Sequence, residues 1–199
     1  MHRVFISYHH ANDQKYKDGL VKWAKENNIF IDYSVDTGDI SDDLTDEQIR
    51  EKIRDEYLRD STVTILLVGT ETKNRKHVDW ELYSSMYNGK INKKSGVIVI
   101  NLPSVNCNYY VASHDGEKEN VFPEQHSWCR ITDRSEFERR YPYMPARIID
   151  NLLKTEACIS VISWDKLDVD KLRYMIDKAY EDRGECVYDL SRPMRRRNS

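Results

Sequence analysis

Glycine is scarce in this sequence, and the phosphate-binding motifs that depend on glycine are absent. The chain has 7 glycines among 199 residues. It contains neither a G-x-G-x-x-G fingerprint after its first strand nor a P-loop, so Rossmann-type dinucleotide binding and NTP hydrolysis are not supported. The G-x-S-x-G nucleophile elbow is also missing, which leaves a serine hydrolase triad without an anchor.

A cysteine metal motif, a long apolar run and a large net charge are absent as well. The spacing of the four cysteines matches no metal motif, so we predict no metal site and reduced thiols in a cytoplasmic protein: Cys107, Cys129, Cys158 and Cys186. No apolar run approaches the roughly 18 residues of a membrane helix, and the N-terminus has no signal-peptide pattern. The net charge of −3 gives no general attraction to nucleic acid or to anionic membranes.

What the sequence does contain is a regular alternation of strand and helix patterns. Short apolar runs that indicate buried strands lie at residues 3–8, 29–35, 62–68, 97–102 and 158–164. Amphipathic helical stripes fall between them. This alternation predicts an α/β domain with a five-stranded parallel sheet, right-handed crossovers and helices on both faces.

Several helix starts can be predicted from local chemistry. Asp13 is a plausible N-cap for the helix after the first strand. Thr45, with Gln48 three residues later, matches a capping box. Pro145 suits the first turn of a later helix, because its missing N–H is not needed there.

The domain organisation is a single domain over residues 1–190, followed by a basic flexible tail at 191–199. Residues 103–144, after the fourth strand, lack clear periodicity but are rich in aromatic residues. Segments of this length are usually functional or contain unrecognised structure. A lid or partner surface and an insertion packed on the edge of the domain are both open interpretations.

The residues that follow the first strand are candidates for ligand binding. Ligands of open α/β sheets gather beyond the carboxyl ends of the strands, where the strand order reverses. Ser7, Tyr8 and His9 stand at that place and could offer hydroxyls and an imidazole. For His9 and the neighbouring His10, exposed loop residues with no role are the alternative.

Glu81 is the sharpest candidate for chemistry. It lies near the start of the helix after the third strand, on the same stripe as Val78 and Leu82. A carboxylate there points toward the carboxyl edge of the sheet. The competing explanation is that Asp79 and Glu81 occupy a first helical turn because the helix dipole favours acids.

The loop after the second strand carries acids where nucleotide-binding folds place a ribose ligand. Asp36 is the candidate, with Asp32 and Asp39 beside it. Ordinary solvation of a polar loop explains the same residues.

These segments resemble the TIR-like proteins of bacteria and archaea, including the TIR subunit of Thoeris antiphage systems. The resemblance is carried by the opening segment 3–10, by the buried strand at 63–70, and by Thr72-Lys-Asn-Arg-Lys-His-Val-Asp-Trp-Glu81. It covers the first ~100 residues well and the final strand and helix weakly. Many TIR enzymes have Trp four residues before the glutamate, where this chain has His77.

The resemblance implies a flavodoxin-like, three-layer fold and an enzyme that cleaves the nicotinamide–ribose bond of NAD. Glu81 matches the catalytic glutamate of the family. Phe5, Tyr8 and Trp80 could stack on nicotinamide or adenine. NAD is the substrate, so no cofactor is expected.

The family also implies a biological setting. Its Thoeris members make an ADP-ribose-derived signal that activates a separate effector protein. Catalytic TIR domains often need assembly, which leaves room for a homo-oligomer. A non-catalytic TIR interaction module and a nucleoside deoxyribosyl transferase are the alternative functions.

Overall fold

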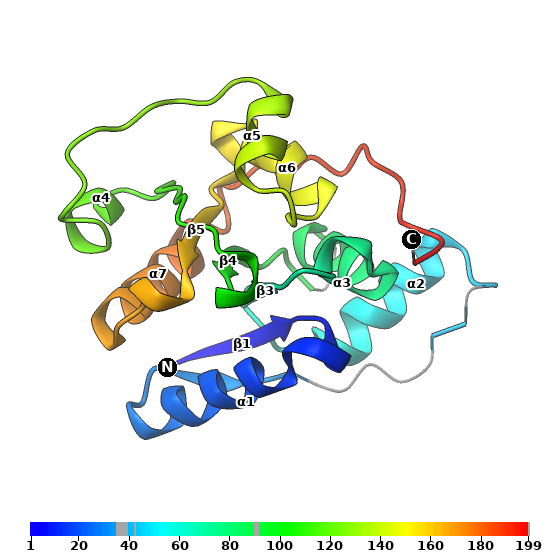
Figure 1. The fold of residues 1–199 in the computed structure, drawn as a ribbon. Helices are drawn as coiled ribbons and strands as arrows, with labels where there is room; N and C mark the ends of the chain where they lie inside the picture. The colour runs from blue at the N-terminus through cyan, green and yellow to red at the C-terminus, as the bar shows by residue number, and fades with distance from the viewer. Residues whose placement is uncertain (35–39, 42, 90–91, 199) are drawn as a thin grey trace.

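The computed structural model describes residues 1–34, 40–41, 43–89 and 92–198. Its centre is a five-stranded sheet in the order β2-β1-β3-β4-β5, with every neighbouring pair parallel (Figure 1). The strands are β1 (His2–Ser7), β2 (Phe30–Asp32), β3 (Val63–Val68), β4 (Gly96–Asn101) and β5 (Ser160–Ser163). This order is that of the flavodoxin-like fold, which confirms the predicted fold class.

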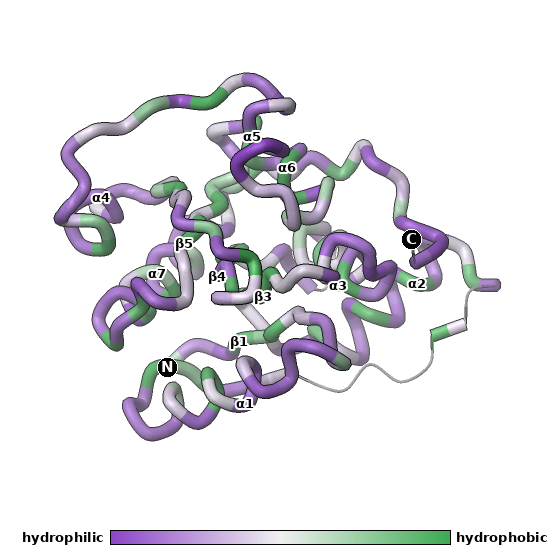
Figure 2. Tube along the Cα trace, viewed as in Figure 1, coloured by the Kyte–Doolittle hydropathy of each residue, from purple (hydrophilic) through white to green (hydrophobic). Residues whose placement is uncertain are grey.

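Helices cover both faces of the sheet because the central strands are apolar on both sides. Every residue of β3 and β4 is buried. Val63, Ile65 and Leu67 pack with α1 (His10–Glu26) and α7 (Val169–Asp182). Leu66 and Val68 pack on the opposite face with α3 (Lys76–Met86) and α6 (Ala146–Leu152). Figure 2 shows the hydrophobic strands at the centre and largely hydrophilic turns on the outside of α1.

The predicted capping box is confirmed at α2 (Asp46–Lys52). The Thr45 hydroxyl accepts a hydrogen bond from the Gln48 backbone N–H, and the Gln48 side chain accepts one from the Thr45 N–H, at 3.2 and 2.9 Å. The helix continues as one π-helical turn, η1 (Ile53–Tyr57). Together they bury Ile49 and Ile53 in a third apolar cluster.

Two local predictions differ from the structure. Asp13 is not the N-cap of α1: His9 holds that position, and the Asp13 N–H donates to the His9 carbonyl at 2.9 Å, inside the first turn. The second strand is shorter than its alternating pattern indicated, because β2 pairs with β1 over only three residues.

The insertion at residues 103–144 wraps around the β5 edge and contributes to the core on both faces of the sheet. Val111 forms an antiparallel bridge with Val161 of β5. Phe122 packs with the α1 and α7 cluster, whereas Phe137 and Tyr141 pack with the α3 and α6 cluster. Its elements are η3 (Pro103–Val105), α4 (Glu117–Asn120) and α5 (Arg134–Arg140). Three further short turns are η2 (Thr72–Asn74), η4 (Thr155–Ala157) and η5 (Trp164–Lys166).

The C-terminal segment differs from the flexible tail expected for residues 191–199. In Figure 1 it runs from α7 past α6 and ends beside α2 and α3. Met194 is buried with Phe5 and Trp80, and Arg196 donates to the Leu44 carbonyl at 2.8 Å and contacts Asp46. The segment is held because its backbone supplies partners to buried groups of α3, described below.

Within the described ranges, no helix is long and apolar enough to cross a membrane.

Candidate active site

The candidate site lies at the carboxyl ends of β1 and β3. After β1 the chain moves outward to β2, whereas β3 is added on the opposite side of β1. The strand order therefore reverses between β1 and β3, which is where ligands bind in open α/β sheets. Ser7 ends β1, and Gly69 follows directly after β3.

Ser7 and Glu81 meet at this point although 74 positions separate them in the sequence. The Ser7 hydroxyl donates a hydrogen bond of 2.6 Å to Glu81 Oε2. Both residues are buried, with exposures of 1% and 3%. The structure thus brings together the two polar residues that the sequence had placed after different strands.

Burial controls the ionisation of Glu81. Removal from water raises the pKa of the Glu81 carboxyl to about 8, and the hydrogen bond from Ser7 opposes this rise. Near neutral pH the carboxyl therefore holds its proton in the free protein. A cation placed beside it would lower this pKa and favour the carboxylate, so the site suits a positively charged ligand.

A buried ion pair fixes the helix that carries Glu81. Arg147 is fully buried, and its Nε and Nη2 donate to the two oxygens of Asp79 at 2.8 and 2.9 Å. The same guanidinium donates to the carbonyls of Arg192 and Pro193 at 3.0 and 3.3 Å. The Arg195 N–H then donates to Asp79 at 2.8 Å.

The C-terminal segment also contacts the two flanks of this ion pair. Trp80 Nε1 donates to the Arg195 carbonyl at 2.8 Å, and the Lys76 N–H at the start of α3 donates to the Asn198 side chain at 2.9 Å. Sequence reasoning gave Asp79 only a helix-dipole role and did not single out Arg147. A fully buried arginine has no sequence signal of its own.

Two of the predicted stacking residues are core residues in the structure. Phe5 and Trp80 have exposures of 2% and 0% and belong to the cluster that α2 covers. Neither ring has an exposed face on which nicotinamide or adenine could stack, so the structure corrects that expectation. Both side chains are apolar and large, and their burial beside Ile49 and Ile53 accounts for their placement.

Tyr8 and His9 lie at the start of α1, beside Ser7. Tyr8 is buried, donates to Gln14 at 2.7 Å and stacks on His10. His9 is half-buried, and burial together with the positive charge of Arg75 lowers its pKa. Its Nδ1 is buried and makes no hydrogen bond within the described part of the chain. His9 therefore presents a neutral imidazole between β1 and the loop that leads into α3.

Asp13 is a candidate that the sequence reasoning missed. Its carboxyl lies against Gly69, where an added Cβ would stand 2.3 Å from Oδ2. Asp13 is 3% exposed, burial raises its pKa, and Oδ2 has no hydrogen-bond partner among the described residues. A second desolvated carboxyl therefore stands at the end of β3, and only glycine at position 69 leaves room for it. Its one sequence signal, an acid early in a helix, was interpreted as an N-cap.

Asp36, the predicted ribose ligand, lies outside the described residues. Its neighbour Asp32 is engaged elsewhere, since it pairs with Lys17 at 3.1 Å and accepts from the Ser34 N–H at 2.9 Å. In the described ranges no group of three or more His, Cys, Asp or Glu side chains could hold a metal ion.

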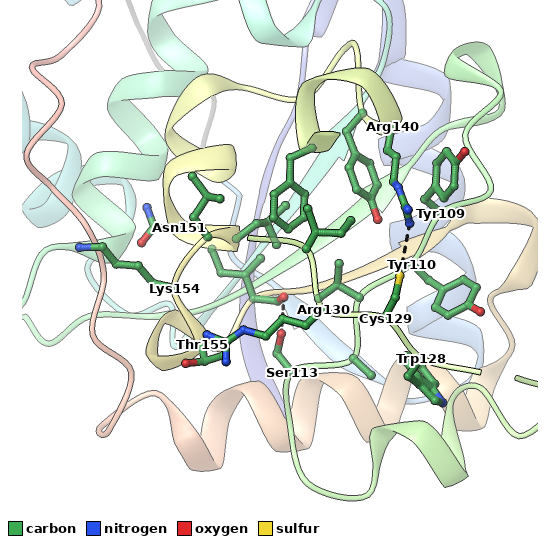
Figure 3. A pocket seen from close by; sticks show the side chains of 18 of the residues that line it. Tyr109, Tyr110, Ser113, Trp128, Cys129, Arg130, Arg140, Asn151, Lys154 and Thr155 are labelled. Carbon is green, nitrogen blue, oxygen red and sulfur yellow. Dashed lines mark hydrogen bonds between the residues drawn. The ribbon is translucent and has the colours of Figure 1, made fainter. Parts of the chain in front are cut away.

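A separate cavity lies under the insertion. It has a volume of about 780 Å³, and Tyr109, Tyr110, Trp128 and Arg130 are among its lining residues (Figure 3). Its other walls come from α5, α6 and the start of β5, and neither Ser7 nor Glu81 lines it. The insertion thus forms a hollow of its own, apart from the β1 and β3 site.

Two comparisons with known proteins bear on this chain. The family model described as "Thoeris protein ThsB, TIR-like domain" matches residues 5–107, which is just over half of the sequence. The matched region contains Ser7, His9, Asp13 and Glu81. A search of curated proteins finds no match.

Proposed function

Because this chain belongs to the TIR-like domain family of the Thoeris protein ThsB, we propose that it is an NAD-cleaving enzyme of antiphage defence with Glu81 as its catalytic carboxylate. The observation that carries the proposal is the buried Glu81 carboxyl, hydrogen-bonded by Ser7 at 2.6 Å at the switch point of the sheet. Perturbed acids at such points are typical of functional sites.

The ionisation of Glu81 suits the chemistry of NAD. The nicotinamide ring of NAD carries a positive charge, and the pKa of Glu81 is raised to about 8 by burial. Binding of that cation next to the carboxyl favours loss of its proton, so substrate and carboxylate charge stabilise each other in a site of low dielectric constant.

The reaction then needs little acid catalysis. The bond between ribose C1′ and the nicotinamide nitrogen breaks, its electron pair stays on nitrogen, and neutral nicotinamide leaves. Positive charge develops on the ribose, where the Glu81 carboxylate stabilises it, as carboxylates do in glycoside cleavage. A hydroxyl then bonds to C1′ and loses its proton, or a ring nitrogen of adenine bonds to C1′ through its lone pair and the adenine loses a proton from its amino group.

The identity of this acceptor decides the product. Water gives ADP-ribose, and a group of the same molecule gives a cyclic product. We propose that the product is an ADP-ribose-derived signal that reaches a separate effector protein by diffusion, as the family resemblance implies. We assign the released proton to His9, because burial lowers its pKa and its Nδ1 makes no hydrogen bond among the described residues.

The test is NAD turnover by the purified chain and by Glu81→Gln, with products separated by mass. Glu26→Gln, at an exposed position of α1, is the matched control. We expect turnover by the parent and by Glu26→Gln, with a loss of at least about 100-fold in Glu81→Gln. Assays at several protein concentrations, with and without lysate of phage-infected cells, cover a requirement for assembly or for a trigger.

The proposal fails if Glu81→Gln turns over NAD as the parent does. It also fails if the folded parent neither binds nor cleaves NAD under any of these conditions. The second result would favour the alternative, a TIR domain that works through protein contacts alone.

A further inference from the structure

Two cysteines lie near each other at the edge of the sheet formed by the amino ends of the strands. Glu81 lies at the opposite edge, at the carboxyl ends. Cys158 stands just before β5, at the amino end of that strand, and Cys186 follows the end of α7. The Val187 N–H donates to the Glu156 carbonyl at 2.7 Å, which draws the two segments together. The Cys158 thiol lies 3.6 Å from the same Glu156 carbonyl, so the thiol and the backbone beside Cys186 share one acceptor. Both are free cysteines, and 27 residues lie between them in the sequence.

The two thiols have different surroundings. Cys186 is fully buried, and its Sγ lies 3.3 Å from the Asp182 carbonyl. Cys158 is partly exposed, so small solutes can reach it. Its backbone has φ of 51°, a left-handed conformation that residues other than glycine seldom adopt. Such conformations persist where surrounding structure holds them, and they cluster at functional positions.

Three titratable side chains act electrostatically on the partly exposed thiol: His114, Asp182 and Glu117. His114 has a fully buried side chain, and its Nδ1 lies 2.6 Å from Asp182 Oδ2. The His114 Nε2 is also buried and has no hydrogen-bond partner in the described part of the chain.

These groups act on the two thiols in opposite directions. The neighbouring Cys186 thiol and, to a smaller extent, His114 lower the pKa of Cys158. Burial and the charges of Asp182 and Glu117 oppose this, but the net shift of the pKa is downward and favours the thiolate. The pKa of Cys186 is raised by the same contact with Cys158 and by burial, so this residue stays a thiol.

We propose that Cys158 and Cys186 form a peroxide-sensitive pair that closes to an intramolecular disulfide. Peroxide oxidises Cys158 first, because this thiol is accessible and His114 lies near it. Cys186 then attacks the oxidised sulfur of Cys158, because it is buried beside that residue. The arrangement is that of redox-sensing cysteines, an accessible reactive thiol beside a second one.

The chemistry balances with hydrogen peroxide as the oxidant. The Cys158 thiolate takes one oxygen from peroxide, whose O–O bond breaks, and water leaves with the proton of the thiol. The sulfenic acid so formed is attacked by the sulfur of Cys186. An S–S bond forms, the S–OH bond breaks, and a second water carries away the remaining proton. Two thiols are oxidised and one peroxide is reduced.

The disulfide would act on the segment that holds α3. Residues 187–198 begin directly after Cys186 and reach Asp79 and Trp80 at their far end. Closing the pair ties the start of this segment to Cys158, two residues before β5. The inference concerns the thiols themselves and does not depend on the proposed NAD chemistry.

The experiment treats the full chain with hydrogen peroxide, blocks remaining thiols with iodoacetamide, and maps peptides by mass spectrometry. We expect a linked pair of peptides containing Cys158 and Cys186, a loss of two hydrogens, and recovery of both thiols with dithiothreitol. Cys107 and Cys129 should still be alkylated at this stage. We expect Cys107 and Cys129 to be oxidised about tenfold more slowly than Cys158.

Three variants identify the roles. Cys186→Ser should accumulate a sulfenic acid at Cys158 that dimedone traps, and Cys158→Ser should form no intramolecular disulfide. Cys129→Ser, at an exposed position, is the matched control and should behave as the parent. The proposal is overturned if peroxide oxidises Cys129 or Cys107 while Cys158 and Cys186 remain alkylatable, a result that the unaltered chain gives regardless of how the variants fold.

Discussion

At the scale of single residues, the site is defined by an acid that the fold keeps out of water. Glu81 has one hydrogen bond from Ser7 and an exposure of 3%. A carboxyl in such a place is costly to ionise, and the protein bears that cost in its stability. The cost is measurable, because it depends on pH.

We predict that Glu81→Gln stabilises the fold increasingly as pH rises. The pKa of Glu81 is 4.5 in the reference state and about 8 in the fold. Between these values the unfolded chain releases the proton that the folded protein keeps, so the free energy of unfolding falls as pH rises through this window and levels off above it. Glutamine does not ionise, so the variant avoids this loss. Near pH 8 its free energy of unfolding should exceed that of the parent by about 2–4 kcal/mol, since each pKa unit corresponds to about 1.4 kcal/mol.

Urea unfolding of both proteins at pH values from about 5 to about 8 measures this difference. The two stabilities should nearly coincide at the acid end and diverge toward the alkaline end. Curves that run parallel across the range would show that Glu81 titrates near its ordinary pKa and is not desolvated.

The sequence identified Glu81, Ser7 and His9 because each follows a strand at the edge where ligands bind. It did not identify Asp13 or the true place of Trp80. Both failures have a physical cause. Whether a helical aromatic residue faces a ligand or the core depends on what covers it, and the cover of Trp80 comes from Met194 and Arg195, far along the chain. The contact of Asp13 with Gly69 depends on the packing of α1 against β3.

At the scale of elements, α3 is positioned by one buried ion pair and the segment bound to it. Arg147 of α6 reaches Asp79 of α3 and two carbonyls of the C-terminal segment. Removing one partner of a buried pair leaves the other charge without compensation, which is more damaging than the loss of the attraction itself.

We predict that Arg147→Met destabilises the protein by about 3–5 kcal/mol, because the Asp79 carboxylate is left buried and unpaired. The matched control is Arg139→Met. Arg139 makes two bonds of the same 2.8 Å length to Glu136, but its side chain is 63% exposed. Exposed pairs contribute about 0–1 kcal/mol, so this variant should change little. Equal losses in the two variants, measured by urea unfolding, would contradict the structural role of the buried pair.

Elements themselves were largely predictable. The strands β1, β3 and β4 and the capping box of α2 follow from local apolar runs and cap chemistry, which need no long-range information. The elements of the insertion could not be predicted in this way, because α4 and α5 are only 4 and 7 residues long: α4 contains no apolar residue, and α5 buries only Phe137. A short helix with one or two buried residues leaves no period to detect.

At the scale of the whole molecule, the insertion is a structural part of the domain. It contributes Phe122 to one face of the sheet and Phe137 to the other. Glu117, fully buried in α4, accepts hydrogen bonds from the Ser113 N–H, the His114 N–H and the Ser160 hydroxyl of β5, at 2.8, 3.1 and 2.6 Å. One carboxylate therefore joins the insertion to the sheet.

This arrangement predicts a single cooperative unfolding transition and a large effect at Glu117. Glu117→Ala removes the acceptor of the buried His114 N–H and Ser160 hydroxyl and leaves the part-buried Ser113 N–H with only a 3.4 Å contact to Ser160 Oγ, so it should lower the free energy of unfolding by roughly 2–4 kcal/mol. Glu119→Ala, two residues later on the exposed side of α4, should have an effect within about 0.5 kcal/mol. Within each of the three proteins, tryptophan fluorescence, which includes Trp128 of the insertion, and far-UV circular dichroism should give coincident midpoints, although the midpoint of Glu117→Ala lies lower than that of the parent. Since Trp128 packs edge-to-face on Phe122, itself part of the α1 and α7 core, the insertion cannot lose its structure while that core stays intact. A fluorescence transition that precedes the loss of helical signal would instead mean that the insertion unfolds on its own, and that Glu117 stabilises only a peripheral loop.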